Sequence, residues 1–148
     1  MIELAMAGIS LFGLGDWTCT SNNVYPDGME EHIESRVTTR KDLTYEETLT
    51  LDYRTSSVPG SHSRLQVFIT GHKDVVGHTF IAYPEEIELV PRTDELRLFS
   101  PEFLEASRAF YLEPSAPIEV VSRDEDAMIL RLKESGEETT CQAVSAGA

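Results

Sequence analysis

Basic residues are scarce in this chain of 148 amino acids. Lys and Arg number 12 against 26 Asp and Glu, which gives a formal net charge of −14. The acidic excess runs through both halves of the sequence, so it does not come from an acidic tail. Because proteins bind nucleic-acid backbones through basic patches, we expect no direct nucleic-acid partner. A net charge of this size also favours solubility.

Long hydrophobic runs are also missing. The longest weakly polar stretch, Ile2 to Leu14, is too short for a transmembrane helix, which takes about 20 apolar residues. It lacks the basic start of a secretory signal, although residues 4–7 are similar to the small-residue end of one. We therefore expect a soluble protein in which residues 1–14 either pack against the rest of the domain or are the remnant of a leader. The chain length predicts one domain over residues 1–148.

Motifs of known catalytic chemistry are absent from the sequence. It contains no Gly-x-Ser-x-Gly, no glycine-rich phosphate loop and no dinucleotide-binding fingerprint. The histidines are His32, His62, His72 and His78; His72 and His78 could meet Asp74 around a turn, but no fourth metal ligand is apparent. The acidic run at residues 124–126 lacks the spacing of a calcium loop. We therefore expect a protein that is not an enzyme and has no metal or cofactor, with these groups exposed to solvent.

The sequence does contain repeated alternation of apolar and polar residues, which is typical of half-buried β-strands. The clearest runs are Met29–Thr39 and Thr44–Tyr53. The other expected strands are Trp17–Val24, Leu65–Gly71, Val75–Tyr83, Ile87–Val90, Ile118–Val121, Met128–Leu132 and Glu138–Val144. In this interpretation Gly77 marks a bulge or bend within a strand, and Pro84 separates two strands. About nine strands at this spacing predict an all-β, antiparallel up-and-down barrel of about 8–10 strands.

One segment departs from the alternation. Ser100 is positioned to cap a helix, and Pro101 suits the first helical position. Phe103 and Phe110 then fall on one face, and Pro114 ends the pattern. We expect one amphipathic helix over about residues 101–112, packed across one end or one wall of the sheet.

The only two cysteines, Cys19 and Cys141, fall in the first and the last expected strands. These two strands pair when an up-and-down barrel closes. We therefore predict a disulfide across the seam. Because disulfides persist in oxidising compartments, it implies a periplasmic or secreted location. The alternative is two free thiols in a cytoplasmic protein.

Gly-Asp-Trp at residues 15–17 opens the first strand, and residues 12–19 resemble the Gly-x-Trp entry of lipocalins and related calycins. A small bacterial variant of that entry has Gly-x-Trp-x-Cys, as this chain does. The resemblance implies a lipocalin-like barrel in which the indole of Trp17 closes the base. It also implies a basic side chain over that indole, for which Arg131 and Lys133 are the candidates. The alternative is that Trp17 is an ordinary core residue.

Two acidic side chains, Glu31 and Glu47, fall on the apolar faces of their strands. A buried carboxylate without a partner is costly, so each of them either pairs with a base or lines a ligand cavity. With Tyr45, Tyr53 and Trp17 they form the expected cavity. A barrel of this size either fills its interior or holds one small ligand. We therefore expect a binding protein for a small apolar molecule or for a protein partner.

The acidic charge leaves a second interpretation open. An inhibitor or immunity-type protein of this charge would bind a basic enzyme or mimic nucleic acid, and complementary charge would speed association. Charge placement separates the two interpretations. Carboxylates of residues 85–95 and 119–138 gathered on one face favour the inhibitor. Carboxylates scattered around an open apolar cavity favour the small-molecule binder.

Overall fold

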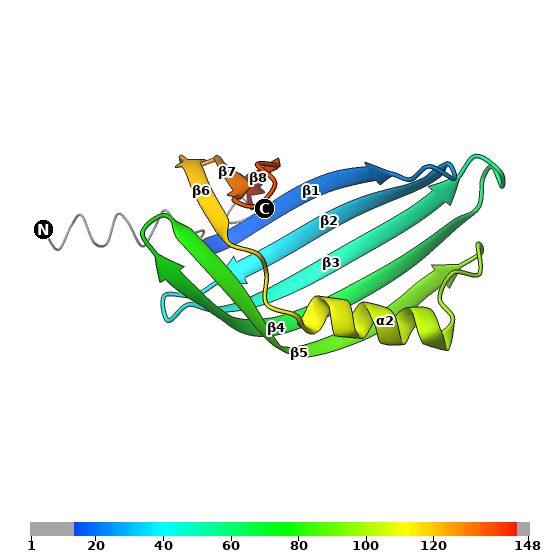
Figure 1. Cartoon of the computed structure of the whole chain (residues 1–148), viewed down its shortest axis with the longest axis horizontal. Helices are drawn as coiled ribbons and strands as arrows, with labels where there is room; N and C mark the ends of the chain where they lie inside the picture. The colour runs from blue at the N-terminus through cyan, green and yellow to red at the C-terminus, as the bar shows by residue number, and fades with distance from the viewer. Residues whose placement is uncertain (1–13, 145–148) are drawn as a thin grey trace, which may run out of the picture.

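The computed structural model describes residues 14–144, so the expected N-terminal segment lies, except for Leu14, outside the described residues. Eight antiparallel strands, each paired with the next, close into an up-and-down barrel (Figure 1). The strands are β1 (Gly15–Val24), β2 (Met29–Thr39), β3 (Thr44–Thr55), β4 (His62–Val76), β5 (Thr79–Asp94), β6 (Ile118–Arg123), β7 (Ala127–Leu132) and β8 (Glu138–Ala143). The predicted fold class is confirmed. No helix within residues 14–144 is long and apolar enough to cross a membrane.

The wall of the barrel is uneven. β1 to β5 have 10 to 16 residues each, whereas β6, β7 and β8 have 6 each. In the described chain, β8 pairs with β1 over residues 17–19, and β6 pairs with β5 only at Thr79 and Phe80. The short strands therefore complete the wall of the barrel at one end only. The rest of β1 to β5 forms a curved sheet, with α2 (Pro101–Leu112) beside β5 (Figure 1).

The helix α2 begins where the sequence predicts it. The hydroxyl of Ser100 accepts a hydrogen bond from the N–H of Phe103 at 3.1 Å, as a helix cap does. Phe103 packs edge-on against Tyr53, with ring centres 6.4 Å apart, and Tyr111 also packs on the core of β3 and β4. Phe110, expected on the inner face, is instead 67% exposed. The helix therefore packs through Phe103, Leu104 and Tyr111.

The alternation predicted for β2 and β3 is confirmed. On β2, Glu31, Ser35 and Thr39 are buried, whereas Glu30, His32 and Glu34 are exposed. The buried side chains form two clusters. One lies on β3 and β4 and contains Tyr45, Leu49, Leu51, Tyr53, Leu65, Val67 and Ile69. The other lies at the end closed by the short strands and contains Trp17, Phe80, Val120, Met128 and Cys141.

The course of β4 differs from the expectation. The predicted strand ended at Gly71, but β4 continues to Val76. The run predicted as one strand over residues 75–83 is a hairpin, and Gly77 lies in its turn with φ 63°. A Cβ atom at Gly71 would lie 2.1 Å from the carbonyl oxygen of Tyr83 on β5. Glycine therefore permits this close approach of two strands, and it does not end the strand.

The course of β5 differs as well, because it passes through Pro84 and Pro91 as one strand. Proline has no N–H to donate, so in sheets it occurs on edge strands or at bulges. The pairing of β4 with β5 shifts register beside both prolines, at Thr70/Gly71 and at Arg64/Leu65. Beyond Phe80, β5 pairs only with β4 in the described chain. Two expected strands therefore merge, and the count is eight.

Candidate ligand-binding cavity

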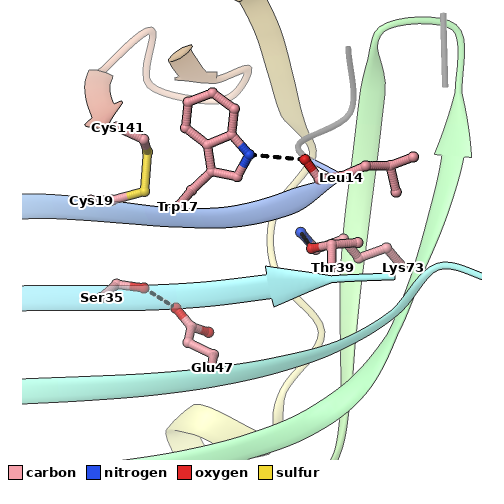
Figure 2. The surroundings of a disulfide bond; sticks show 8 residues. All are labelled: Leu14, Trp17, Cys19, Ser35, Thr39, Glu47, Lys73 and Cys141. Carbon is pink, nitrogen blue, oxygen red and sulfur yellow. Dashed lines mark hydrogen bonds between the residues drawn. A yellow bond between two sulfur atoms is a disulfide. The ribbon is translucent and has the colours of Figure 1, made fainter. Parts of the chain in front are cut away.

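Cys19 and Cys141 form a disulfide where β1 pairs with β8 (Figure 2). The two residues are direct partners in the register, and their Cα atoms are 4.2 Å apart. The predicted disulfide is confirmed. It joins positions 122 residues apart in the sequence and so ties the two ends of the strand series together.

The indole of Trp17 lies beside this disulfide and is 3% exposed. Its N–H donates to the carbonyl of Leu14 at 3.1 Å (Figure 2). The guanidinium of Arg123 lies 5.1 Å from the ring centre and donates to the same carbonyl at 3.3 Å. A basic group over the indole is therefore present, and it comes from the end of β6.

The two candidates predicted for this place, Arg131 and Lys133, are wrong. Arg131 pairs with Glu138 at 2.7 Å and with Glu119 at 3.4 Å, and Lys133 is exposed after the end of β7. Strict alternation along β6 would turn Arg123 outward, because Val120 faces the core. However, the register between β6 and β7 shifts between Val120 and Ser122, and this bulge returns Arg123 to the inner side.

A cavity of about 670 Å³ lies inside the barrel. Trp17, Phe80 and Met128 line it at the end closed by the short strands. Residues of β2, β3 and β4, among them Val37 and Ile69, line a further wall, and the end of α2 adds another. The lining is mostly apolar. The volume lies within the range of about 300–1,000 Å³ that is usual for small-molecule sites.

Two charged side chains on the inner face of the sheet line this cavity. The first is Glu47 of β3. Its carboxylate accepts a hydrogen bond from the hydroxyl of Ser35 at 2.5 Å (Figure 2). Burial raises the pKa of the Glu47 carboxyl, while the bond from Ser35 and the charge of Lys73 act against this increase. Glu47 therefore brings a carboxylate into an apolar space.

The second is Lys73 of β4, which is 8% exposed. Its ammonium donates to the hydroxyl of Thr39 at 2.8 Å. It also lies 4.6 Å from the ring centre of Phe80 and 5.5 Å from that of Tyr45, both cation–π distances. Burial lowers the pKa of Lys73 to about 8, and the charge of Glu47 opposes this decrease. The strands thus bring one acidic and one basic side chain, Glu47 and Lys73, to the cavity.

The sequence-based prediction missed Lys73 because it ended the strand at Gly71. A signal was nevertheless available. Leu65, Val67 and Ile69 alternate inward, and continuing this alternation through Gly71 places Lys73 on the same face.

Of the predicted cavity residues, Trp17, Tyr45 and Glu47 line the cavity. Glu31 and Tyr53 are not part of its lining, although both are buried, each 8% exposed. They lie toward the part of the sheet that α2 covers, since Tyr53 contacts Phe103 of the helix.

Among residues 14–144, hydrogen-bond donors hold the carboxylate of Glu31 and no basic side chain pairs with it. The amide of Asn23 and the hydroxyl of Tyr25 both donate to the same oxygen at 2.9 Å. Burial raises the pKa of the Tyr53 phenol, and its interaction with Glu31 raises this pKa further. Glu31 is therefore satisfied within the protein, whereas Glu47 faces the cavity.

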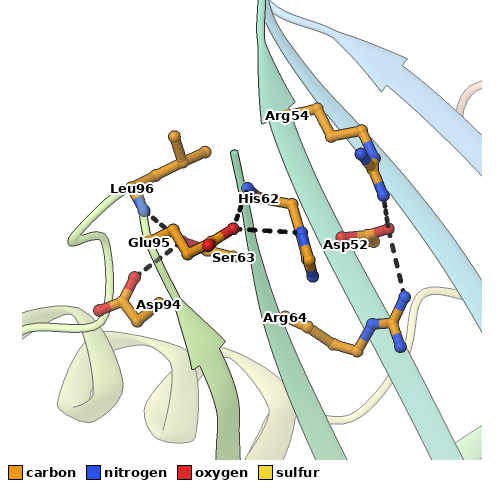
Figure 3. A network of polar contacts seen from close by, with 8 residues as sticks. All are labelled: Asp52, Arg54, His62, Ser63, Arg64, Asp94, Glu95 and Leu96. Carbon is orange, nitrogen blue, oxygen red and sulfur yellow. Dashed lines mark hydrogen bonds and ion pairs between the residues drawn. The ribbon is translucent and has the colours of Figure 1, made fainter. Parts of the chain in front are cut away.

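A polar network outside the cavity fastens the segment that leads to α2 (Figure 3). The carboxylate of Asp94 accepts from the hydroxyl of Ser63 at 2.8 Å and from the backbone N–H groups of Leu98 and Phe99 at 2.7 and 3.0 Å. Nearby, Glu95 accepts from the backbone N–H of His62 at 3.1 Å. These bonds fix the turn after β5 and so determine where α2 starts.

The same figure shows Asp52 between Arg54 and Arg64, at 3.4 and 3.5 Å (Figure 3). His72 stacks on Tyr83 and bonds to Glu85 at 2.7 Å. Over residues 14–144, no three His, Cys, Asp or Glu side chains are grouped as metal ligands.

Comparison with known family models and with curated proteins finds no match to this sequence.

Proposed function

We propose that this protein binds a small, mainly apolar molecule inside the barrel, as a lipocalin-like carrier does. The observation that carries the proposal is the cavity of about 670 Å³ with a mostly apolar lining. Burying apolar ligand surface there stabilises the complex by about 25 cal/mol per Å² before the costs of binding are subtracted. Trp17 under Arg123 at the closed end supports the lipocalin-like interpretation. The disulfide supports a periplasmic or secreted location.

The placement of the acidic residues also supports a carrier over an inhibitor. The carboxylates of residues 85–95 belong to β5 and the turn after it, and those of residues 119–138 lie on β6, on β8 and in the turns that join β6, β7 and β8. In the described chain these strands pair only at Thr79 and Phe80, so the two groups lie on different parts of the barrel. Several of these carboxylates also bind partners within the chain, among them Asp94 and Glu138.

Titration with the neutral apolar dye N-phenyl-1-naphthylamine tests the proposal. We expect its fluorescence to rise on binding, with one site per chain. Val37→Phe places extra volume in the cavity lining and should weaken binding by about tenfold or more, because overfilled sites force side chains from their places. Val76→Phe, at a position that is 81% exposed, is the matched control and should bind like the wild type. Equal dye binding by all three proteins, or none by the wild type, would contradict the proposal.

A further inference from the structure

We infer that the ligand carries an uncharged polar head group, with one hydrogen-bond acceptor for Lys73 and one donor for Glu47. The inference rests on the proposed function, and it names the class of molecule that the cavity takes: a neutral amphiphile, such as a long-chain primary amide, and not a fatty acid or an amine.

Lys73 and Glu47 keep unused hydrogen-bonding capacity inside the cavity. A lysine ammonium has three N–H donors, and Lys73 uses one of them on Thr39. No carboxylate of the described chain lies within ion-pair distance of it. Glu47 accepts from Ser35 through Oε2 only, so within residues 14–144 its Oε1 has no donor. One donor group and one acceptor group therefore stay available beside the apolar lining.

Lys73 and Glu47 face the same cavity, and the charge of each favours the charged form of the other. A charged head group would add an uncompensated charge beside these two groups, which is costly away from water. An uncharged head group that accepts from Lys73 and donates to Glu47 uses both groups and adds no charge.

Two further charged residues lie around the cavity. Glu113, after α2, and Glu137, before β8, also belong to its lining, and both are exposed. An anionic head group would add negative charge to a cavity that three carboxylates, Glu47, Glu113 and Glu137, already line. A cationic head group would meet the ammonium of Lys73 inside. Both kinds of charged ligand are therefore disfavoured, whereas a neutral one meets neither repulsion.

Displacement of bound N-phenyl-1-naphthylamine by three probes of equal chain length tests the inference at pH 7. The probes are dodecanamide, dodecanoate and dodecylammonium. We expect dodecanamide to displace the dye at about tenfold lower concentration than either charged probe, because each hydrogen bond to a charged group contributes about this factor. A wild-type protein that prefers dodecanoate or dodecylammonium, or that does not distinguish the three, would overturn the inference and leave the proposed function intact. Failure of the dye itself to bind would overturn both.

Two single variants make the test independent of the absolute affinities. Glu47→Gln leaves Lys73 as the charged member of this pair, so the preference should move to dodecanoate. Lys73→Met leaves Glu47, so the preference should move to dodecylammonium. Lys41→Met, at an exposed turn position, should keep the wild-type order. The melting temperature of each variant shows whether it is folded. If Glu47→Gln and Lys73→Met are both folded and rank the three probes as the wild type does, the assignment of Lys73 and Glu47 is contradicted.

Discussion

Lys73→Met should make the protein more stable at neutral pH, although it removes a hydrogen bond. The reason is that the ammonium is buried among Tyr45, Phe80 and the cavity lining. Its pKa falls from 10.5 to about 8 in the folded protein. Each factor of ten in proton affinity is worth about 1.4 kcal/mol, so burial of the charge costs at most about 3 kcal/mol. The variant loses the bond to Thr39 and leaves Glu47 without its counter-charge, which reduces the expected gain to about 1–2 kcal/mol.

The gain must depend on pH in a defined direction. Below pH 8, Lys73 is protonated in both the folded and the unfolded chain, so the wild type bears the full cost. Between pH 8 and 10.5 the unfolded chain keeps a proton that the folded chain has released, so the stability of the wild type rises with pH. At pH 10 the advantage of the variant should therefore shrink to about 1 kcal/mol or less.

Urea unfolding at pH 7 and pH 10, with the disulfide intact, measures both effects. Lys41→Met is the matched control, because this lysine is exposed and the same change there should leave the unfolding free energy within about 0.5 kcal/mol. If Lys73→Met were less stable than the wild type at pH 7, or if its gain were the same at both pH values, the burial argument would be refuted.

Three further changes test the fold. Gly71→Ala should destabilise by about 1–3 kcal/mol in thermal unfolding, because its Cβ would collide with the carbonyl of Tyr83; a neutral effect would contradict the close approach of the strands. Replacing Cys19 and Cys141 together by Ser should lower the unfolding free energy by about 5 kcal/mol in the chain-entropy model, and an unchanged urea midpoint would show that the seam needs no bond. Arg123→Met should change the emission of the only tryptophan and cost about 0.5–2 kcal/mol, whereas an unchanged spectrum would exclude the stacked arrangement.

The sequence predicts most of the fold because one face of β2 and β3 meets solvent while the other meets the core. Residues 29–39 and 44–53 therefore alternate in the sequence as they do in the structure. The disulfide was predictable for a related reason, since closure of an up-and-down barrel makes β1 and β8 neighbours.

The errors occur where the chain breaks a local rule for a non-local reason. Pro84 and Pro91 usually interrupt strands, but β5 tolerates them beside bulges and along an edge that has no strand partner in the described chain. Gly71 usually weakens a strand, yet here it admits the backbone of β5. Ending the strand at Gly71 hid Lys73, the base that shares the cavity with Glu47. The tolerance of the two prolines and of Gly71 depends on a neighbouring strand that the local sequence does not reveal.

The central claim, that the barrel interior holds a small apolar molecule, is tested most directly by NMR contacts between protein and ligand. With dodecanamide bound, the account predicts nuclear Overhauser effects from its alkyl chain to the methyl groups of Ile69 and Leu130 and to the indole of Trp17, all of which line the cavity. Contacts confined to exposed side chains such as Val24 and Val121, or no contacts at saturating ligand, would contradict it.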